Sequence, residues 1–149
     1  MFLLDSNVIS ETRKGHEADR GVMDLISQHA SELFLPVQVI GELQSGITKL
    51  LQRGDLPQAM RVEQWFQAIL KKHSSRILTF DLTCAMRWGV LRGSSEQNQI
   101  DKQIAAIALV YDLTVVTRNI SHFTGTGVRL LNPFLADVPG EPMSQNEPR

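Results

Sequence analysis

The chain of 149 residues has the length of one domain, and its net charge of −1 excludes a broadly basic nucleic-acid-binding surface, although not a local basic cluster. Hydrophobic residues make up 42% of the sequence, yet no run approaches the roughly 18 consecutive apolar residues that a membrane helix needs. The N-terminus reaches Asp5 without a signal-peptide pattern, so we expect a cytoplasmic protein with no membrane partner.

Short apolar runs alternate along the chain with segments of helical periodicity. Five runs have the length and composition of strands: residues 2–4, 33–35, 77–80, 113–117 and 128–131. A first helix is predicted after Ser6 as its cap, ending at Gly15, and a later helix has Pro36 in its first turn. The other predicted helices occupy residues 18–30, 37–53, 56–72, 82–91 and 100–111.

This alternation of strands and helices predicts the fold class. Successive strands that are joined by helices pair in parallel through right-handed crossovers. We therefore expect an α/β domain with a central, mostly parallel five-stranded sheet and helices on both faces. Residues 1–134 are assigned to this domain, and residues 135–149, rich in Pro, Gly and polar side chains, are predicted to be a disordered C-terminal tail.

Three acidic residues occupy positions where such a fold places a functional crevice. Asp5 directly follows the first strand, and an acid there costs stability unless it is paired or exposed at a crevice. Glu42 lies beside the apolar stripe of its helix, and Asp101 lies near the start of a helix whose small residues allow close packing. Taken singly, Glu42 and Asp101 are also explained as ordinary acids on helix surfaces.

Four segments together resemble the motifs of PIN-domain proteins, in particular the ribonuclease toxins of the virulence-associated protein C family of type II toxin–antitoxin systems. They lie in order at residues 3–11, 39–46, 101–109 and 113–119, the last ending in Thr117-Arg118-Asn119. The resemblance runs from residue 1 to about residue 134. The family often carries a fourth acid three residues after this Asn, where the present chain has His122.

The resemblance implies a PIN-like fold and an endoribonuclease that depends on Mg²⁺ or Mn²⁺. Asp5 and Asp101 would be the principal metal ligands, with Glu42 a ligand directly or through water. Phosphodiester hydrolysis needs an activated water and neutralisation of charge on the phosphate, both of which carboxylate-bound divalent ions supply. Crowding of these acids should raise the pKa of at least one of them in the metal-free protein.

Four further residues are weaker candidates for the site. Thr117 and Asn119 would orient Asp5 or a metal-bound water, or else simply form a turn at the strand end. Arg118 is a candidate phosphate contact or a solvated surface residue. If His122 faces the site, its imidazole should favour Mn²⁺ over Mg²⁺, whereas in solvent it would matter little. Other candidate contacts to RNA are Arg13, Lys14 and Lys102.

The resemblance also implies partners. A cognate antitoxin would lay its C-terminal segment in an apolar groove, block the acids and bind operator DNA through its N-terminal part. The toxin would form a homodimer and cleave transfer RNA or ribosomal RNA. An inactive PIN-fold interaction module is the alternative. A metal-dependent phosphatase is a third reading, but it needs a second Asp two residues after its nucleophile, where this chain has Asn7.

Overall fold

A computed structural model describes residues 1–139 and contains one parallel sheet with the strand order β3-β2-β1-β4-β5. The strands are β1 (Phe2–Leu4), β2 (Leu33–Pro36), β3 (Ile77–Leu78), β4 (Thr114–Val116) and β5 (Leu130–Leu131). The central strand β1 pairs with β2 on one side and with β4 on the other. Because all neighbours are parallel, the carboxyl ends of β1 and β4 meet at one edge of the sheet, which is where Asp5 and Thr117 lie.

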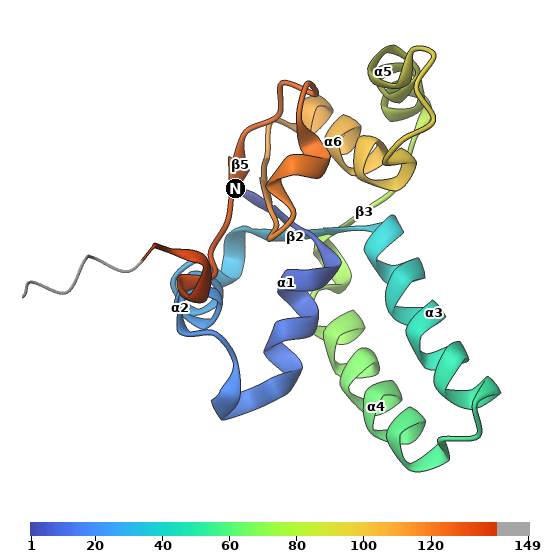
Figure 1. Ribbon diagram of the computed structural model, residues 1–149, viewed down its shortest axis with the longest axis vertical. Coiled ribbons are helices and arrows are strands. Elements are labelled where there is room, and N and C mark those ends of the chain that lie inside the picture. The colour runs from blue at the N-terminus through green and yellow to red at the C-terminus, as the bar shows by residue number, and fades with distance from the viewer. Residues whose placement is uncertain (140–149) are drawn as a thin grey trace, which may run out of the picture.

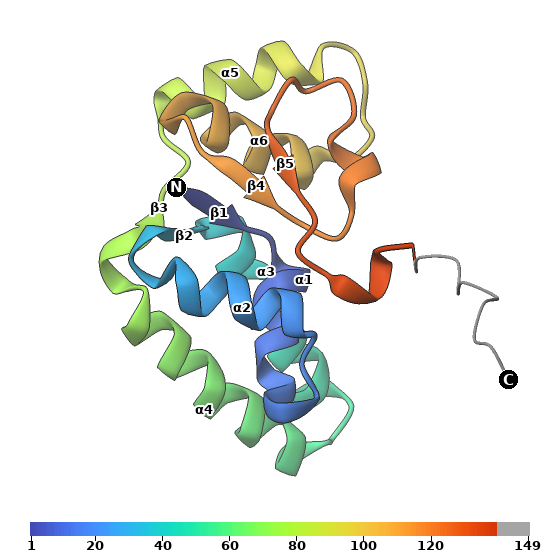
Figure 2. The ribbon, with the colours of Figure 1, turned by 90° about the vertical axis from the view of Figure 1, so that its left-hand side faces the viewer.

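Helices cover both faces of the sheet, which confirms the predicted α/β architecture. In Figures 1 and 2, α1 to α4 lie on one side of the sheet, and α5 and α6 lie on the other. This division follows from right-handed crossovers, because the chain reverses its direction across the sheet after β3. The helices are α1 (Ser6–Glu11), α2 (Arg20–Gln28), α3 (Val37–Gln52), α4 (Leu56–Lys72), α5 (Leu82–Arg92) and α6 (Gln99–Tyr111).

The strands read as continuous apolar runs because both of their faces are buried. Leu3 and Leu4 of β1 and Val115 of β4 are fully buried. Helix α6 packs closely against the sheet through buried small residues, among them Ala105 and Ala108. Among residues 1–139, no helix combines the length and the apolar character that crossing a membrane requires.

Several local details differ from the sequence-based expectation. Asp5, not Ser6, caps α1, because the extended backbone of Asp5 lets its side chain accept the Ser6 N–H at 2.8 Å. Pro36 ends β2 with an extended backbone instead of lying in the first turn of α3. Gly15 does not end α1, which stops at Glu11; it lies inside a following 3₁₀ helix, Thr12–Glu17, with a φ of 60°.

The segment after Phe134 also differs from the predicted disordered tail. Leu135–Asp137 form a short 3₁₀ helix. The carboxylate of Asp19 accepts the N–H groups of Leu135 and Ala136 at 3.0 and 3.1 Å, which ties this turn to the start of α2. Composition did not reveal this attachment because it depends on a cap more than one hundred residues away. The rest of the predicted tail, residues 140–149, lies outside the described residues.

Candidate active site

Asp5 lies at the centre of the candidate site and is only 3% exposed. Its N–H continues the sheet by donating to the carbonyl oxygen of Val116 at 3.0 Å, which places its side chain beside the end of β4. There Asp5 Oδ2 accepts a hydrogen bond from Thr117 Oγ1 at 2.8 Å. Two neighbouring strands therefore fix the position of this carboxylate.

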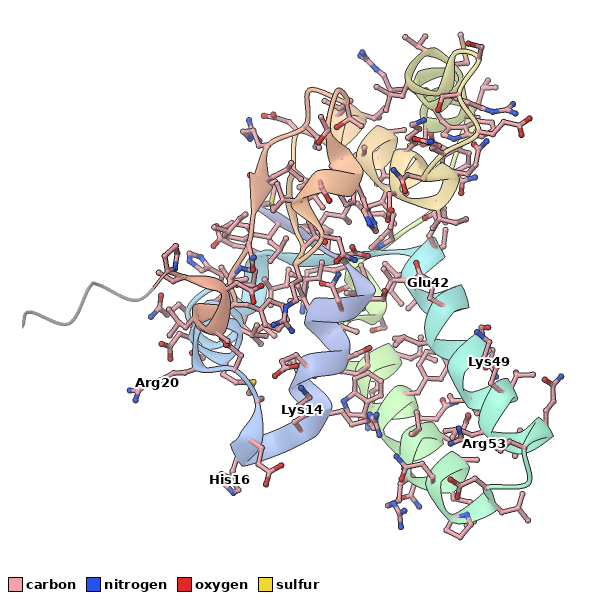
Figure 3. All side chains as sticks on the ribbon, viewed as in Figure 1. Lys14, His16, Arg20, Glu42, Lys49 and Arg53 are labelled. Atoms are coloured by element: carbon pink, nitrogen blue, oxygen red, sulfur yellow. The ribbon has the colours of Figure 1, made fainter. Side chains whose placement is uncertain are left out.

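The first turn of α1 connects Asp5 to the other motifs. Ser6 Oγ donates to Glu42 Oε2 at 2.8 Å, which turns the Glu42 carboxylate toward the end of β1. Figure 3 shows Glu42 near the start of α3. The Asn7 amide donates to Thr117 Oγ1 at 3.3 Å and, more weakly, to Asp5 Oδ2 at 3.4 Å, while Asn7 Oδ1 accepts the N–H of Arg118 at 3.1 Å. Short hydrogen bonds thus join three of the four motifs.

Asp101 enters the site from the first turns of α6. Its Oδ2 lies 3.1 Å from Nδ1 of His122, which belongs to the 3₁₀ helix Ile120–Phe123. Of the two orientations that the sequence left open for His122, the structure has the one in which the imidazole contacts an acid of the site.

The three carboxylates perturb one another. Burial raises the pKa of Asp101, and repulsion from Asp5 raises it further, while His122 acts in the opposite direction. Partial burial also raises the pKa of Glu42, as does repulsion from Asp5 and Asp101, against the hydrogen bond from Ser6. Interactions of this size require that the acids of β1, α3 and α6 face a common space, and they agree with the crowding expected from the sequence.

This donor set fits a divalent cation. Within residues 1–139, no Lys or Arg forms an ion pair with Asp5, Glu42 or Asp101, so their negative charge is left uncompensated except by His122. In the same part of the chain, no three His, Cys, Asp or Glu side chains form a ready-made coordination shell. Mg²⁺ does not need one, because it binds through one or two carboxylates and keeps several of its waters.

The raised pKa of Asp101 predicts that Asp101→Asn stabilises the metal-free protein. The folded state holds the Asp101 proton more tightly than the unfolded state does, so wild-type stability falls as the pH rises from about 4 through the raised pKa. We expect the variant to have the higher Tm in EDTA at pH 7.5, with the difference vanishing near pH 4. A penalty of about 1 kcal/mol corresponds to roughly 2–4 °C. A lower Tm for the variant at pH 7.5 would contradict this interpretation.

The remaining candidates are placed less uniformly. Thr117 is fully buried against Asp5, and its Oγ1 accepts the N–H of Asn119 at 3.0 Å, whereas the residue Asn119 itself is exposed. The Arg118 guanidinium points away from the acids: it forms a bidentate ion pair with Asp137 at 2.8 and 3.0 Å and lies over the ring of Phe134. This placement does not support the phosphate contact predicted for Arg118.

The basic candidates for RNA contact are also away from the acids or engaged locally. Lys14 pairs with Glu11 at 2.8 Å, and in Figure 3 it lies at the end of the α1 segment that is remote from Glu42. Lys102 donates to Ser95 Oγ at 3.0 Å, and Arg13 is exposed. None of the three is brought into contact with an acid of the site in the described part of the chain.

Sequence reasoning missed two residues of the site. Ser6 was assigned only a capping role, although its hydroxyl holds Glu42, and Asn7 was considered only as a missing acid, although it links Asp5 to the strand β4 motif. The signal was present as a run of three polar residues, Asp-Ser-Asn, directly after a buried strand. Polar side chains at that point face the crevice together, whatever their individual capping roles.

Comparisons of the sequence with known proteins agree with this geometry. Residues 2–124 match a family described as PIN domain. The chain is 35% identical to plasmid stability protein StbB of Pseudomonas syringae pv. tomato, over 91% of this chain and 100% of the relative. It is 32% identical to toxin FitB of Neisseria gonorrhoeae, over 90% and 99%. It is also 29% identical to VapC ribonuclease Y4jK of Sinorhizobium fredii, over 90% and 98%.

Solved structures give the same grouping. FitAcB from Neisseria gonorrhoeae is similar with a TM-score of 0.74 and 30% identity, covering 89% of this chain and 98% of that chain. FitAB bound to the IR36 DNA fragment is similar with a TM-score of 0.73 and 29% identity, covering 89% and 95%. The similarity therefore extends over nearly the whole chain and includes the segments that carry the three acids.

Proposed function

This chain belongs to the PIN-domain family, and on that premise we propose that it is the toxin of a type II toxin–antitoxin pair and acts as a divalent-metal-dependent endoribonuclease. Its similarity to toxin FitB and to VapC ribonuclease Y4jK supports both parts of the proposal. The observation that carries the chemistry is the convergence of Asp5, Glu42 and Asp101 without a Lys or Arg partner among residues 1–139.

Each acid has a separate task in this proposal. Asp5 and Asp101 hold the ion, and Glu42 contributes directly or through a water. When bound, Mg²⁺ or Mn²⁺ neutralises charge on the scissile phosphate and makes a water more acidic. Thr117 and Ser6 act as positioning residues, because their hydroxyl groups fix the Asp5 and Glu42 carboxylates before substrate arrives. Transfer RNA or ribosomal RNA is the proposed substrate.

A cognate antitoxin is the proposed partner, with operator DNA reached only through it. The similar FitAB structure, which contains a DNA fragment, supports such an assembly. An apolar cleft of about 330 Å³ between α3 and α4, lined in part by Ile47, Leu51 and Met60, offers an antitoxin segment a place to bind. Its walls are almost entirely apolar, as a groove for a docked peptide segment requires.

A growth experiment tests this toxin assignment. Expression of the chain alone should arrest growth of the host, and co-expression of the protein encoded next to it should restore growth and yield a co-purifying complex. The variant Asp24→Asn, altered at an exposed acid of α2, should remain toxic. Unimpaired growth of cells that accumulate the folded protein without a partner would count against the toxin assignment.

The proposed toxin forms a homodimer, and α5 is the surface that supports this. Leu82, Met86 and Val90 recur at four-residue spacing and are 77%, 69% and 77% exposed, an unusual apolar stripe for a free helix face. Met86→Glu should therefore convert the dimer to a monomer in light scattering, because it buries a charge in the contact. Met60→Glu is the matched control on α4 and should leave the dimer intact. A monomeric wild-type protein at micromolar concentration would contradict the proposal.

The two alternative functions fit the site less well. A pure interaction module gains nothing from uncompensated acids whose mutual repulsion costs stability. A phosphatase of the kind considered above needs a second carboxylate in place of Asn7, and the Asn7 amide is committed to Thr117 and to the N–H of Arg118. Endoribonuclease activity therefore remains the best-supported proposal.

A further inference from the structure

His122 is the histidine that touches the acid cluster. The other three histidines lie elsewhere: His16 is exposed, His29 pairs with Glu32 on the surface, and His73 is buried at the end of α4. The contact between His122 and Asp101 joins two elements that are 21 residues apart. It therefore depends on the tertiary fold, unlike the local contact between His29 and Glu32.

The position of His122 is fixed by its surroundings. The 3₁₀ helix that carries it directly follows Asn119, and the His122 N–H donates to the Asn119 carbonyl oxygen at 3.1 Å. The next residue, Phe123, is 1% exposed and anchors this helix in the core. A buried anchor beside a half-exposed imidazole keeps the ring at the mouth of the site with little conformational freedom.

The distance between the two side chains suits joint coordination of one ion. Two ligands that bind a metal at about 2.1 Å and at right angles lie about 3.0 Å apart. Asp101 Oδ2 and His122 Nδ1 are separated by 3.1 Å. The pair is thus already spaced as one edge of an octahedral site, and Asp101 needs no rearrangement to share an ion with the imidazole.

We propose that His122 is a nitrogen ligand of the ion held by Asp101 and makes the site selective for Mn²⁺ over Mg²⁺. The inference rests on the proposed metal-dependent function and extends the ligand set beyond the three carboxylates. Mg²⁺ prefers oxygen ligands and has little affinity for imidazole, whereas first-row transition metals accept it readily. A neutral ring in this place also leaves the cluster one negative charge poorer than a fourth carboxylate would, which weakens Mg²⁺ binding in particular.

Mn²⁺ is itself the probe, because its bound form can be counted and its ligands identified by electron paramagnetic resonance. The purified full-length protein should bind Mn²⁺ and show spin-echo modulation from a directly coordinated ¹⁴N nucleus. His122→Ala should abolish this modulation and weaken Mn²⁺ binding by about 10-fold or more. His122→Asp should lack the modulation but bind Mg²⁺ more tightly than the wild type. His29→Ala, which breaks the surface pair with Glu32, should change neither result.

The outcomes separate this inference from the proposed function. If Mn²⁺ binds in an Asp101-dependent way but shows no ¹⁴N modulation, His122 is only a hydrogen-bond partner of Asp101, and the inference is wrong while the metal site stands. If Mn²⁺ binding is unchanged in both Asp5→Asn and Asp101→Asn, the acids do not form the metal site, and the proposed function fails with the inference.

Discussion

Replacing Asp5 with Asn should reduce RNA cleavage by more than about 100-fold, since even residues that only support a metal ligand typically cost 10–100-fold when mutated. The Asn side chain has the same shape but removes the negative charge at the point where β1, α3 and α6 converge. Its oxygen can still accept the Ser6 N–H that starts α1. The expected result is therefore an inactive protein that remains folded, measured by single-turnover cleavage of a folded RNA.

Two comparisons make the Asp5 result specific. Asp24→Asn removes a similar charge from the exposed surface of α2 and should retain full activity. The circular dichroism spectrum of Asp5→Asn should match that of the wild type, which excludes unfolding as the cause of its inactivity. Wild-type cleavage rates in folded Asp5→Asn would remove Asp5 from the site.

The second large effect is expected at Thr117, which is fully buried. Its hydroxyl donates to Asp5 Oδ2 at 2.8 Å and accepts the N–H of Asn119 at 3.0 Å. Thr117→Val keeps the shape but leaves both partners without this hydrogen bond, at a cost of about 1–3 kcal/mol in the free energy of unfolding. Cleavage should fall as well, because the Asp5 carboxylate loses the contact that orients it.

The controls for Thr117 distinguish orientation of Asp5 from general destabilisation. Thr117→Ser keeps the hydroxyl and should recover most of the activity. Thr114→Val, on the same strand but with its hydroxyl directed to Arg129, should leave the cleavage rate unchanged. Equal activity of Thr117→Val and the wild type, measured well below both melting temperatures, would show that Thr117 does not position Asp5.

Much of the fold could be predicted because local and global signals agree. Strands buried on both faces produce apolar runs, and this pattern located all five strands and their parallel pairing. The edge strands came out shorter than predicted: residues 77–80 and 128–131 were expected, whereas β3 and β5 have two residues each. An apolar run marks burial, but a strand also needs a paired neighbour, and edge strands have only one.

The candidate site could be predicted in part. The position of Asp5 follows from parallel strand geometry, whereas the choice of Glu42 and Asp101 came from resemblance to PIN-domain motifs. The contacts of Arg118 with Asp137, and of Asp19 with the turn at Leu135, had no local signal because their partners are far apart in sequence. A polar segment looks disordered by composition until the carboxylates that satisfy its N–H groups are known.

Cleavage of a folded RNA by the purified protein, with Mg²⁺ or Mn²⁺ and then with EDTA, tests the central claim most directly. We expect cleavage with either ion, none in EDTA, none by Asp5→Asn in any condition, and no hydrolysis of a phosphate monoester. Cleavage that persists in EDTA, or that is unaffected by Asp5→Asn, would contradict the assignment of Asp5, Glu42 and Asp101 as a metal-dependent ribonuclease site.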